Sequence, residues 1–348
     1  MWKHLALALV GGLVAWSISW ASEEEKEVQS QMRESAALKE ELKDCPYRII
    51  CESYQSNNWE LFVMNADGSD PVNLTNTPDA HEMYPHVSPD GAKISFVSDE
   101  TQGRRTVRCV YVMNLDGSGR RKIVDGGREP CWSGDSQSLA YVKSKYKEFQ
   151  VNDYATKGLY FYNLETGQET AHPNPAIEHL YNICLSPDGN WIVTTVHAAM
   201  GFSHAILAIE RNGNGVYDLK IEGCRPDISP DGQHLAWGWD DHTLAVGDLN
   251  LVASGPTVTN IKKIVIDNEH VYHVDWSPDG RYLAYSRGVG GNMPVKGPGT
   301  NRGVAEMVGV RGPWVLHVTP AAGGGDCASL TPLGETFKEA DWIYPAKP

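Results

Sequence analysis

The sequence predicts an all-β protein, a six-bladed β-propeller closed by pairing of its N- and C-terminal strands. One phrase recurs five times: an apolar residue, then Ser-Pro-Asp-Gly or a close variant, then a short apolar strand. The copies begin at Ser88, Ser133, Ser186, Ser229 and Ser277. Their spacings of 45, 53, 43 and 48 residues match the period of a four-stranded propeller blade.

Each copy has the chemistry of a tight turn between two strands. Proline presets φ for the first corner, aspartate bonds its own backbone, and glycine accepts positive φ. The residues after the turn alternate in character, as in Ile94 and Phe96 or Leu283 and Tyr285, and this period of two indicates a strand. The turn aspartates are therefore predicted to form turns and not to act as catalytic carboxylates.

The two ends of the chain are expected to share the sixth blade. Residues 47–51, 60–64 and 71–75 are predicted as the second, third and fourth strands of a blade that lacks its first strand. Near the C-terminus, Glu339-Ala340-Asp341-Trp342 matches His273-Val274-Asp275-Trp276, which precedes the fifth turn. A C-terminal strand that completes the first blade would leave the ring without a free edge.

These repeats resemble those of the TolB-like β-propeller family, whose WD40-like (PD40) segment carries the phrases W-S-P-D-G-x-x-I-A-F and I-Y-V-M-N-A-D-G-S. The matching residues here include Trp276 to Gly280 and Val63 to Gly68, and the resemblance covers roughly residues 47–344. The TolB protein carries a separate α/β domain before its propeller, and the about 25 residues between the predicted signal peptide and the first strand here cannot hold one. The resemblance therefore implies the propeller and not the TolB role in the cell envelope.

The N-terminus has the pattern of a secretory signal peptide, predicted at residues 1–21. An apolar run from Leu5 to Ala15 is too short to span a membrane, and small residues stand at the expected cleavage site, Ala21. The mature protein is expected to be periplasmic or secreted, monomeric and without a transmembrane segment. Removing residues 1–21 takes away one lysine and no acid, so the net charge of −14 becomes −15. Such an acidic chain is not expected to bind nucleic acid.

The predicted organisation continues with a charged segment, 22–44, and the propeller, 45–346. The segment is interpreted as a solvated helix or linker, with a helix that binds a partner as the alternative. Seven cysteines in an exported chain leave at least one thiol unpaired, and at most one or two bridges are expected. Cys131 and Cys184 occupy matching positions in neighbouring blades, but the spacing does not decide whether they form a disulfide.

One rim of the ring is predicted to carry the binding function. Turns after the first and third strands share one face and are short, whereas loops after the second strands and crossovers share the other and vary widely. Residues 143–156, 197–203 and 288–313 lengthen three blades on this second face, and the Gly-rich 288–313 stretch is interpreted as an insertion. Variable loops on a rigid scaffold are where binding usually occurs, so a protein or glycan ligand is expected there.

Three histidines suggest a metal hypothesis. His81, His179 and His270 each stand seven residues before the turn serine, in alternate blades, and would converge on the ring axis. Three imidazoles suit a divalent metal, with manganese, zinc or calcium as candidates and no cofactor certain. The alternative is that a histidine inherited with the repeat caps a loop or bonds a backbone carbonyl.

A second polar set recurs four residues before each turn serine and is predicted to face the channel mouth as ligand-binding residues. Its members are Tyr84, Glu129, Asn182, Arg225, His273 and Glu339. Two residues before the turn serine stand His86, Cys131, Cys184, Asp227, Asp275 and Asp341. The three aspartates are predicted to tie adjacent blades through backbone N–H groups.

Two functions follow from these patterns. The favoured one is a non-catalytic exported propeller that binds a protein or glycan through its loop-rich face. The alternative is a metal-dependent lyase on uronic-acid polysaccharide, by fold-level analogy with propeller lyases that act on oligogalacturonate and carry a histidine-rich metal centre at the channel mouth. There a metal would polarise the uronate carboxylate while a His or Tyr takes the α-proton. No catalytic residue is assigned.

Overall fold

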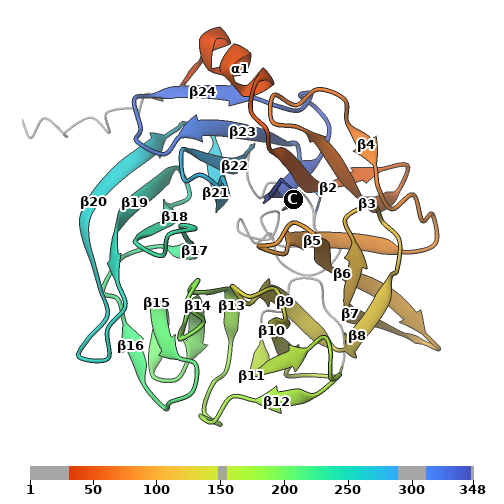
Figure 1. Ribbon diagram of the computed structural model, residues 1–348, viewed down its shortest axis with the longest axis vertical. Coiled ribbons are helices and arrows are strands. Elements are labelled where there is room, and N and C mark those ends of the chain that lie inside the picture. The colour runs from red at the N-terminus through yellow and green to blue at the C-terminus, as the bar shows by residue number, and fades with distance from the viewer. Residues whose placement is uncertain (1–30, 148–154, 289–310, 346–348) are drawn as a thin grey trace, which may run out of the picture.

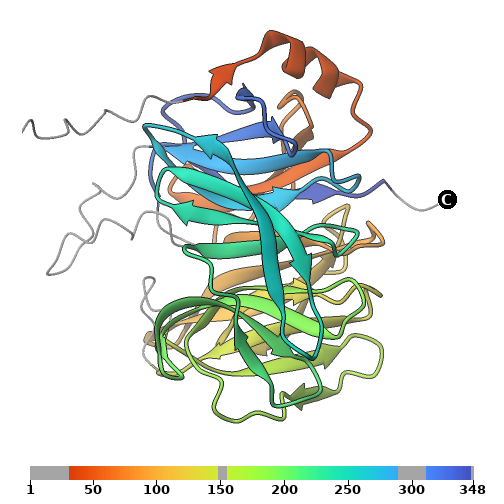
Figure 2. The same ribbon diagram turned by 90° about the vertical axis from the view of Figure 1, so that its left-hand side faces the viewer.

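A computed structural model describes residues 31–147, 155–288 and 311–345 of the chain, and nearly all of its regular elements are strands. Six sheets are arranged in a ring (Figure 1), which confirms the predicted six-bladed β-propeller. Turned by 90°, the ring is a disc, and helix α1 stands at its edge (Figure 2). The predicted signal peptide and most of the 288–313 insertion lie outside the described residues.

The blades are antiparallel four-stranded sheets, each with its first strand innermost. Blade 1 contains β25 (Phe337–Ile343), β2 (Arg48–Gln55), β3 (Asn58–Asn65) and β4 (Val72–Asn73). Blade 2 contains β5 (His81–Val87), β6 (Lys93–Gln102), β7 (Arg105–Asn114) and β8 (Arg121–Asp125). Blade 3 contains β9 (Gly127–Trp132), β10 (Ser138–Ser144), β11 (Thr156–Asn163) and β12 (Glu169–Ala171).

The second half of the ring repeats this order. Blade 4 contains β13 (Leu180–Leu185), β14 (Trp191–Ala199), β15 (Phe202–Glu210) and β16 (Val216–Asp218). Blade 5 contains β17 (Cys224–Ile228), β18 (His234–Asp240), β19 (Thr243–Asn250) and β20 (Thr257–Ile266). Blade 6 contains β21 (His270–Trp276), β22 (Tyr282–Gly288), β23 (Trp314–Pro320) and β24 (Asp326–Ser329), and β1 (Arg33–Glu34) adds a fifth strand parallel to β24.

The recurring turns follow one pattern of hydrogen bonds. In the first, the Ser88 hydroxyl donates to Asp90 Oδ1 at 2.6 Å, and the same oxygen accepts from the Ala92 N–H at 3.0 Å. The turns at Ser133, Ser186, Ser229 and Ser277 repeat both bonds. The prediction that these aspartates form turns is confirmed, because their carboxylates are used to fix the corner.

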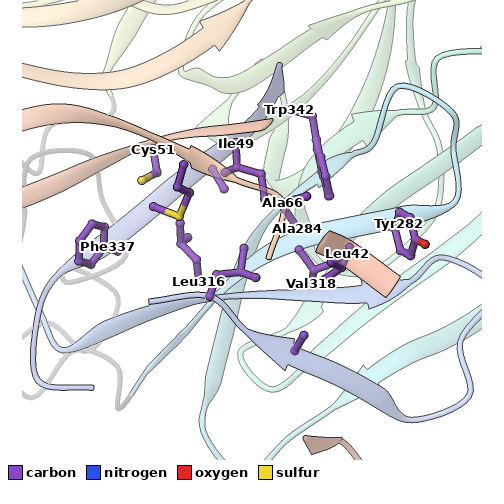
Figure 3. Close-up of a cluster of buried hydrophobic side chains, with 14 of the residues drawn as sticks. Leu42, Ile49, Cys51, Ala66, Tyr282, Ala284, Leu316, Val318, Phe337 and Trp342 are labelled. Atoms are coloured by element: carbon purple, nitrogen blue, oxygen red, sulfur yellow. The ribbon is translucent and has the colours of Figure 1, made fainter. Parts of the chain in front are cut away.

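Closure of the ring brings together both ends of the chain. Strand β25 pairs with β2, so Trp342 lies opposite Ile49 and Asp341 opposite Ile50. A core cluster forms between blades 6 and 1, shown in Figure 3, and includes Trp342, Tyr282 and Leu42. The predicted closure by the terminal strands is therefore confirmed.

Helix α1 (Ala36–Lys43) lies within the charged segment and packs on the outside of the closure. The Ser35 hydroxyl caps it by accepting from the Leu38 N–H at 3.2 Å. Leu38 and Leu42 are buried in the same cluster as Trp342. The charged side chains of the helix are exposed to water. Two apolar residues four positions apart lie on the same face of a helix, and here they are enough to dock it. Because the segment has so few apolar residues, its sequence did not reveal that the helix packs on the propeller.

Candidate functional site

The six polar residues predicted at the channel mouth do gather around the ring axis, and we call them the inner ring: Tyr84, Glu129, Asn182, Arg225, His273 and Glu339. All six have left-handed backbone conformation, with φ between 46° and 55°. The first strand of every blade also shifts register at this position, so each residue marks a β-bulge. A non-glycine residue held there costs about 1 kcal/mol or more and persists only where its surroundings fix it.

Hydrogen bonds from the neighbouring blade fix several of these bulges. The Tyr84 N–H donates to Glu52 Oε2 at 2.8 Å, and the Asn182 N–H donates to Glu129 Oε2 at 3.0 Å. In blade 5, the Arg225 N–H donates to the Thr195 hydroxyl at 2.9 Å. The bulge therefore frees a backbone N–H from the strand ladder and uses it to join adjacent blades.

The set two residues before the turn serine forms a second layer of links. The Val87, Trp276 and Trp342 N–H groups donate to the carboxylates of Asp341, Asp227 and Asp275 at 3.2, 3.0 and 3.2 Å. The prediction that these aspartates tie adjacent blades is confirmed. In blade 3 the Cys131 sulfur replaces the carboxylate and accepts from the Leu185 N–H at 3.3 Å. Thiol and carboxylate therefore serve the same position in different blades.

A cavity of about 60 Å³ lies on the axis between these two layers. Tyr84, Asn182, Arg225 and His273 line it together with members of the second layer, while Glu129 and Glu339 are not among its lining residues. One water occupies roughly 10–15 Å³ by this measure, so the cavity holds a few waters or one small ion. Pockets for larger organic ligands measure about 300–1,000 Å³, so a sugar chain does not fit here.

The best-defined charges in the channel are a buried pair. His273 Nδ1 lies 2.9 Å from Glu339 Oε2, and His273 Nε2 donates to the Ala340 carbonyl at 3.0 Å. Burial alone would lower the pKa of His273, but the Glu339 carboxylate outweighs it and the pKa is raised. Burial likewise opposes ionisation of Glu339, yet His273 lowers the pKa of Glu339 to about 2. Each group therefore favours the charged form of the other.

The aspartates of the second layer behave in the opposite way. Burial raises the pKa of Asp227 to about 7, against the lowering effect of the Trp276 N–H, and the charge of Asp341 adds to the rise. Burial also raises the pKa of Asp275 well above its ordinary value, and Asp341 and Asp227 contribute further. Asp227, Asp275 and Asp341 repel one another when charged, so the three carboxylates cannot all ionise cheaply.

A buried pair in the channel wall was not predicted from the sequence. Glu52 and Lys338 are both fully buried, and Glu52 Oε1 lies 3.6 Å from Lys338 Nζ. Burial raises the pKa of Glu52 to about 7, although the Lys338 charge opposes this. Both residues lie on strands in which apolar and polar residues mix without a clear period, so the sequence offered no sign that these charges point inward.

The three histidines of the metal hypothesis stand at three blade junctions, each with a local contact. His81 Nδ1 accepts from the Trp59 N–H at 3.2 Å, and His179 Nδ1 lies 3.1 Å from the His197 carbonyl oxygen. His270 packs edge-on against His242, with ring centroids 4.8 Å apart. These contacts are of the loop-capping kind given as the alternative. Neither group of described residues with metal-ligand spacing contains any of the three, so their metal site stays a prediction.

The structure also shows how the cysteines are used. All seven cysteines lie in described residues, and no disulfide joins any two of them. Cys131 and Cys184 use their sulfur atoms in hydrogen bonds to the next blade, at 3.3 Å from the Leu185 nitrogen and 3.5 Å from the Pro226 carbonyl oxygen. Burial raises the pKa of Cys131 to about 12, so this thiol is protonated at neutral pH.

The face predicted to bind, which we call the loop rim, carries the connections after the second strands and the blade crossovers. Tyr146, after β10, and Leu333, in the β24–β25 crossover, expose 58% and 86% of their surface there. On the same rim the β14–β15 hairpin holds His197 and His204, whose ring centroids are 5.7 Å apart. Aromatic, apolar and imidazole groups thus stand on this rim.

Comparison with known proteins agrees with this architecture. Residues 261–289 match the family model "WD domain, G-beta repeat". The Tol-Pal system protein TolB of Alcanivorax borkumensis is 34% identical over 97 residues, which is 26% of this chain and about a fifth (21%) of that protein. No helix of the described residues is long and apolar enough to cross a membrane.

Solved structures share the fold at low identity. TolB from Acinetobacter baumannii aligns with a TM-score of 0.62 and 20% identity, over 86% of this chain and 67% of that one. A chain of a nidogen/laminin complex aligns with a TM-score of 0.54 and 9% identity, over 86% and 98% of the two chains. Repeat, blade count and structural likeness agree that the chain is a six-bladed β-propeller, similar in fold to the propeller of TolB.

Proposed function

We propose that this protein is an exported, non-catalytic binding module that recognises a protein partner through its loop rim. The observation that carries the proposal is that polar groups in the channel are already bonded to neighbouring blades. Inner-ring residues that were predicted to bind a ligand join adjacent blades, as in the hydrogen bond of Asn182 to Glu129 and the ion pair of His273 with Glu339. The axial cavity is also too small for an organic ligand of ordinary size.

Recognition then falls to the loop rim, where Tyr146 and Leu333 project on a rigid scaffold. Aromatic side chains commonly anchor protein interfaces, and large apolar groups gain most when a partner covers them. The matched chain of the nidogen/laminin complex supports the proposal, because a propeller of this fold there takes part in a protein assembly. Export is proposed from the predicted signal peptide, so the partner would lie in the periplasm or outside the cell.

Rim substitutions test this proposal. Tyr146→Ser and Leu333→Ser remove apolar surface from the rim, so partners cross-linked to the parent protein in its own compartment should be reduced about 10-fold or more. Quantitative mass spectrometry of the cross-linked material measures the change. Val72→Ser is the matched control, because Val72 is 60% exposed at the start of β4, beside the opposite face.

Equal recovery of partners with all three variants would contradict the proposal. Cleavage of polygalacturonate by the parent protein, lost in a His81/His179/His270→Ala variant, would instead support the lyase alternative. The intact mass of the exported protein separately tests the predicted cleavage after Ala21.

A further inference from the structure

One group of metal-binding side chains lies away from the channel, where β1 meets blade 6. Glu34 on β1, His317 on β23 and Cys327 on β24 each offer one ligand atom, and these atoms all lie within 4.8 Å of one another. His317 and Cys327 are buried, whereas Glu34 is exposed at the edge. No spacing pattern in the sequence marks this group, because Glu34 is nearly 300 residues from its neighbours.

Hydrogen bonds outside the group orient two of its members. His317 Nδ1 lies 3.3 Å from the Val315 carbonyl oxygen and can only donate to it, so Nε2 is left to face Glu34 Oε1 at 3.2 Å. The other oxygen of Glu34 accepts from the Ser329 N–H at 3.0 Å. A histidine held by a carbonyl through one nitrogen presents the other in the manner typical of a metal ligand.

A fourth polar group borders the site. The Tyr285 hydroxyl is buried, and among the described residues no nitrogen or oxygen atom is its hydrogen-bond partner. Its ring lies 5.6 Å from the His317 ring, and its hydroxyl adjoins the Cys327 thiol. A thiol is a weak hydrogen-bond partner, and a ligand at this point would give the buried hydroxyl a stronger one.

A second group of the same kind differs in one decisive respect. Glu100, Cys109 and Asp125 also have ligand atoms within 4.8 Å of one another. There, however, Lys122 Nζ lies 2.6 Å from Glu100 and 3.1 Å from Asp125, so an ammonium group already supplies the positive charge. Among the described residues, Glu34 has only His317 as an ion-pair partner. The second group is therefore a matched control for the first.

We propose that Glu34, His317 and Cys327 bind one zinc ion, with the Tyr285 hydroxyl or a water as the fourth ligand. Sulfur, nitrogen and oxygen donors in a four-coordinate site suit zinc. Zinc–ligand bonds of about 2.0–2.3 Å place tetrahedral ligands roughly 3.3–3.8 Å apart, so the present arrangement needs about 1 Å of closure. On binding, the Cys327 thiol forms a sulfur–zinc bond and releases its proton to solvent.

The ion would act as a clamp for the N-terminal segment. Strand β1 pairs with β24 through only two residues, Arg33 opposite Asp326 and Glu34 opposite Cys327. So short a strand is a weak attachment by itself. A ligand from β1 and two from blade 6 would join the segment to the ring beside helix α1.

Cobalt titration tests the clamp on the full chain, purified without an affinity tag, reduced and freed of metal. One equivalent of Co²⁺ should produce a thiolate-to-cobalt charge-transfer band in the near ultraviolet, and Zn²⁺ should abolish it. Cys327→Ser should lack this band, whereas Cys109→Ser and the His81/His179/His270→Ala variant should keep it. Cobalt bound without the band, or a band that persists in Cys327→Ser, would overturn the proposal.

Glu34→Gln covers the case in which Cys327→Ser does not fold, because Glu34 is exposed and its substitution leaves the core intact. This variant should keep the band and bind Co²⁺ about 10-fold or more weakly. Unchanged affinity would remove Glu34 from the site and with it the clamp. Absence of any Co²⁺ binding by the parent protein would overturn the proposal as a whole.

Discussion

Trp342→Ala is expected to lower the free energy of unfolding by about 4 kcal/mol, the usual cost of truncating a buried tryptophan. Trp342 is fully buried where the C-terminal strand completes blade 1 (Figure 3). Its ring stacks on Tyr282 with centroids 6.3 Å apart, and its indole N–H donates to the Asp275 carbonyl at 3.3 Å. The substitution therefore removes packing and a hydrogen bond from β25, the strand that completes blade 1 by pairing with β2 from the other end of the chain.

The thermal midpoint should fall by roughly 8 °C, measured by circular dichroism. Trp276→Ala is the matched control: this indole makes the equivalent bond, to the Asp227 carbonyl at 3.2 Å, but its strand β21 belongs to a blade whose strands β21 to β24 follow one another along the chain. Both variants should melt early, but only Trp342→Ala should expose the amides of β25 and β2 to rapid hydrogen exchange. Equal exchange in the two variants would show that the backbone ladder alone holds the closure.

The architecture could be predicted because it repeats. Every copy of the Ser-Pro-Asp-Gly turn carries its own local chemistry, and the match between residues 339–342 and 273–276 is enough to locate the closure. Aspartates two residues before the turn could also be assigned to blade junctions, since a polar residue at one register of a buried strand needs a fixed partner. A turn pattern that recurs five times can be recognised even when one copy departs from it, as the second turn does with Gly134 in place of proline.

The site could be predicted only in part, because its geometry depends on the backbone. The polar positions of the inner ring were found, but their left-handed conformation was not, since Tyr84, Glu129 and Glu339 are not residue types that signal positive φ. In Tyr84, Asn182 and Arg225 this conformation directs a backbone N–H to the neighbouring blade, while ligand binding by the inner ring stays a prediction. The group of Glu34, His317 and Cys327 was missed for a different reason: a two-residue strand brings one member from the far end of the chain.

Stability is expected to fall as the pH rises from 5 to 8, and Asp227 is the residue best placed to show it. Its pKa is about 7 in the folded protein and about 3.9 in an unfolded chain. Between these values the folded state keeps a proton that the unfolded state has lost, so raising the pH favours unfolding. Three pKa units correspond to about 4 kcal/mol, but Asp227 lines the axial cavity and water there reduces the cost, so about 2 kcal/mol is expected.

His273 acts in the same direction. Its pKa is raised in the folded state, so its contribution is complete below about pH 6.5 and is lost as the pH rises through the folded value. Glu339, with a pKa of about 2, contributes above about pH 4.3 and weakens the protein only in stronger acid. The stability maximum is therefore expected on the acidic side of neutrality, near pH 5.

Asp227→Asn isolates the aspartate. The amide oxygen can still accept from the Trp276 N–H, but the side chain no longer ionises. At pH 5 the melting temperature of the variant should therefore equal that of the parent or lie below it, and at pH 8 it should be higher than that of the parent. Asp231→Asn is the control: burial opposes ionisation of Asp231, but the Ser229 hydroxyl and the Gln233 N–H keep its pKa below the ordinary value. Its effect should therefore be the same at pH 5 and pH 8. Parallel melting curves for Asp227→Asn and the parent across this range would mean that Asp227 is ionised throughout, and that a cation or water in the cavity compensates its charge.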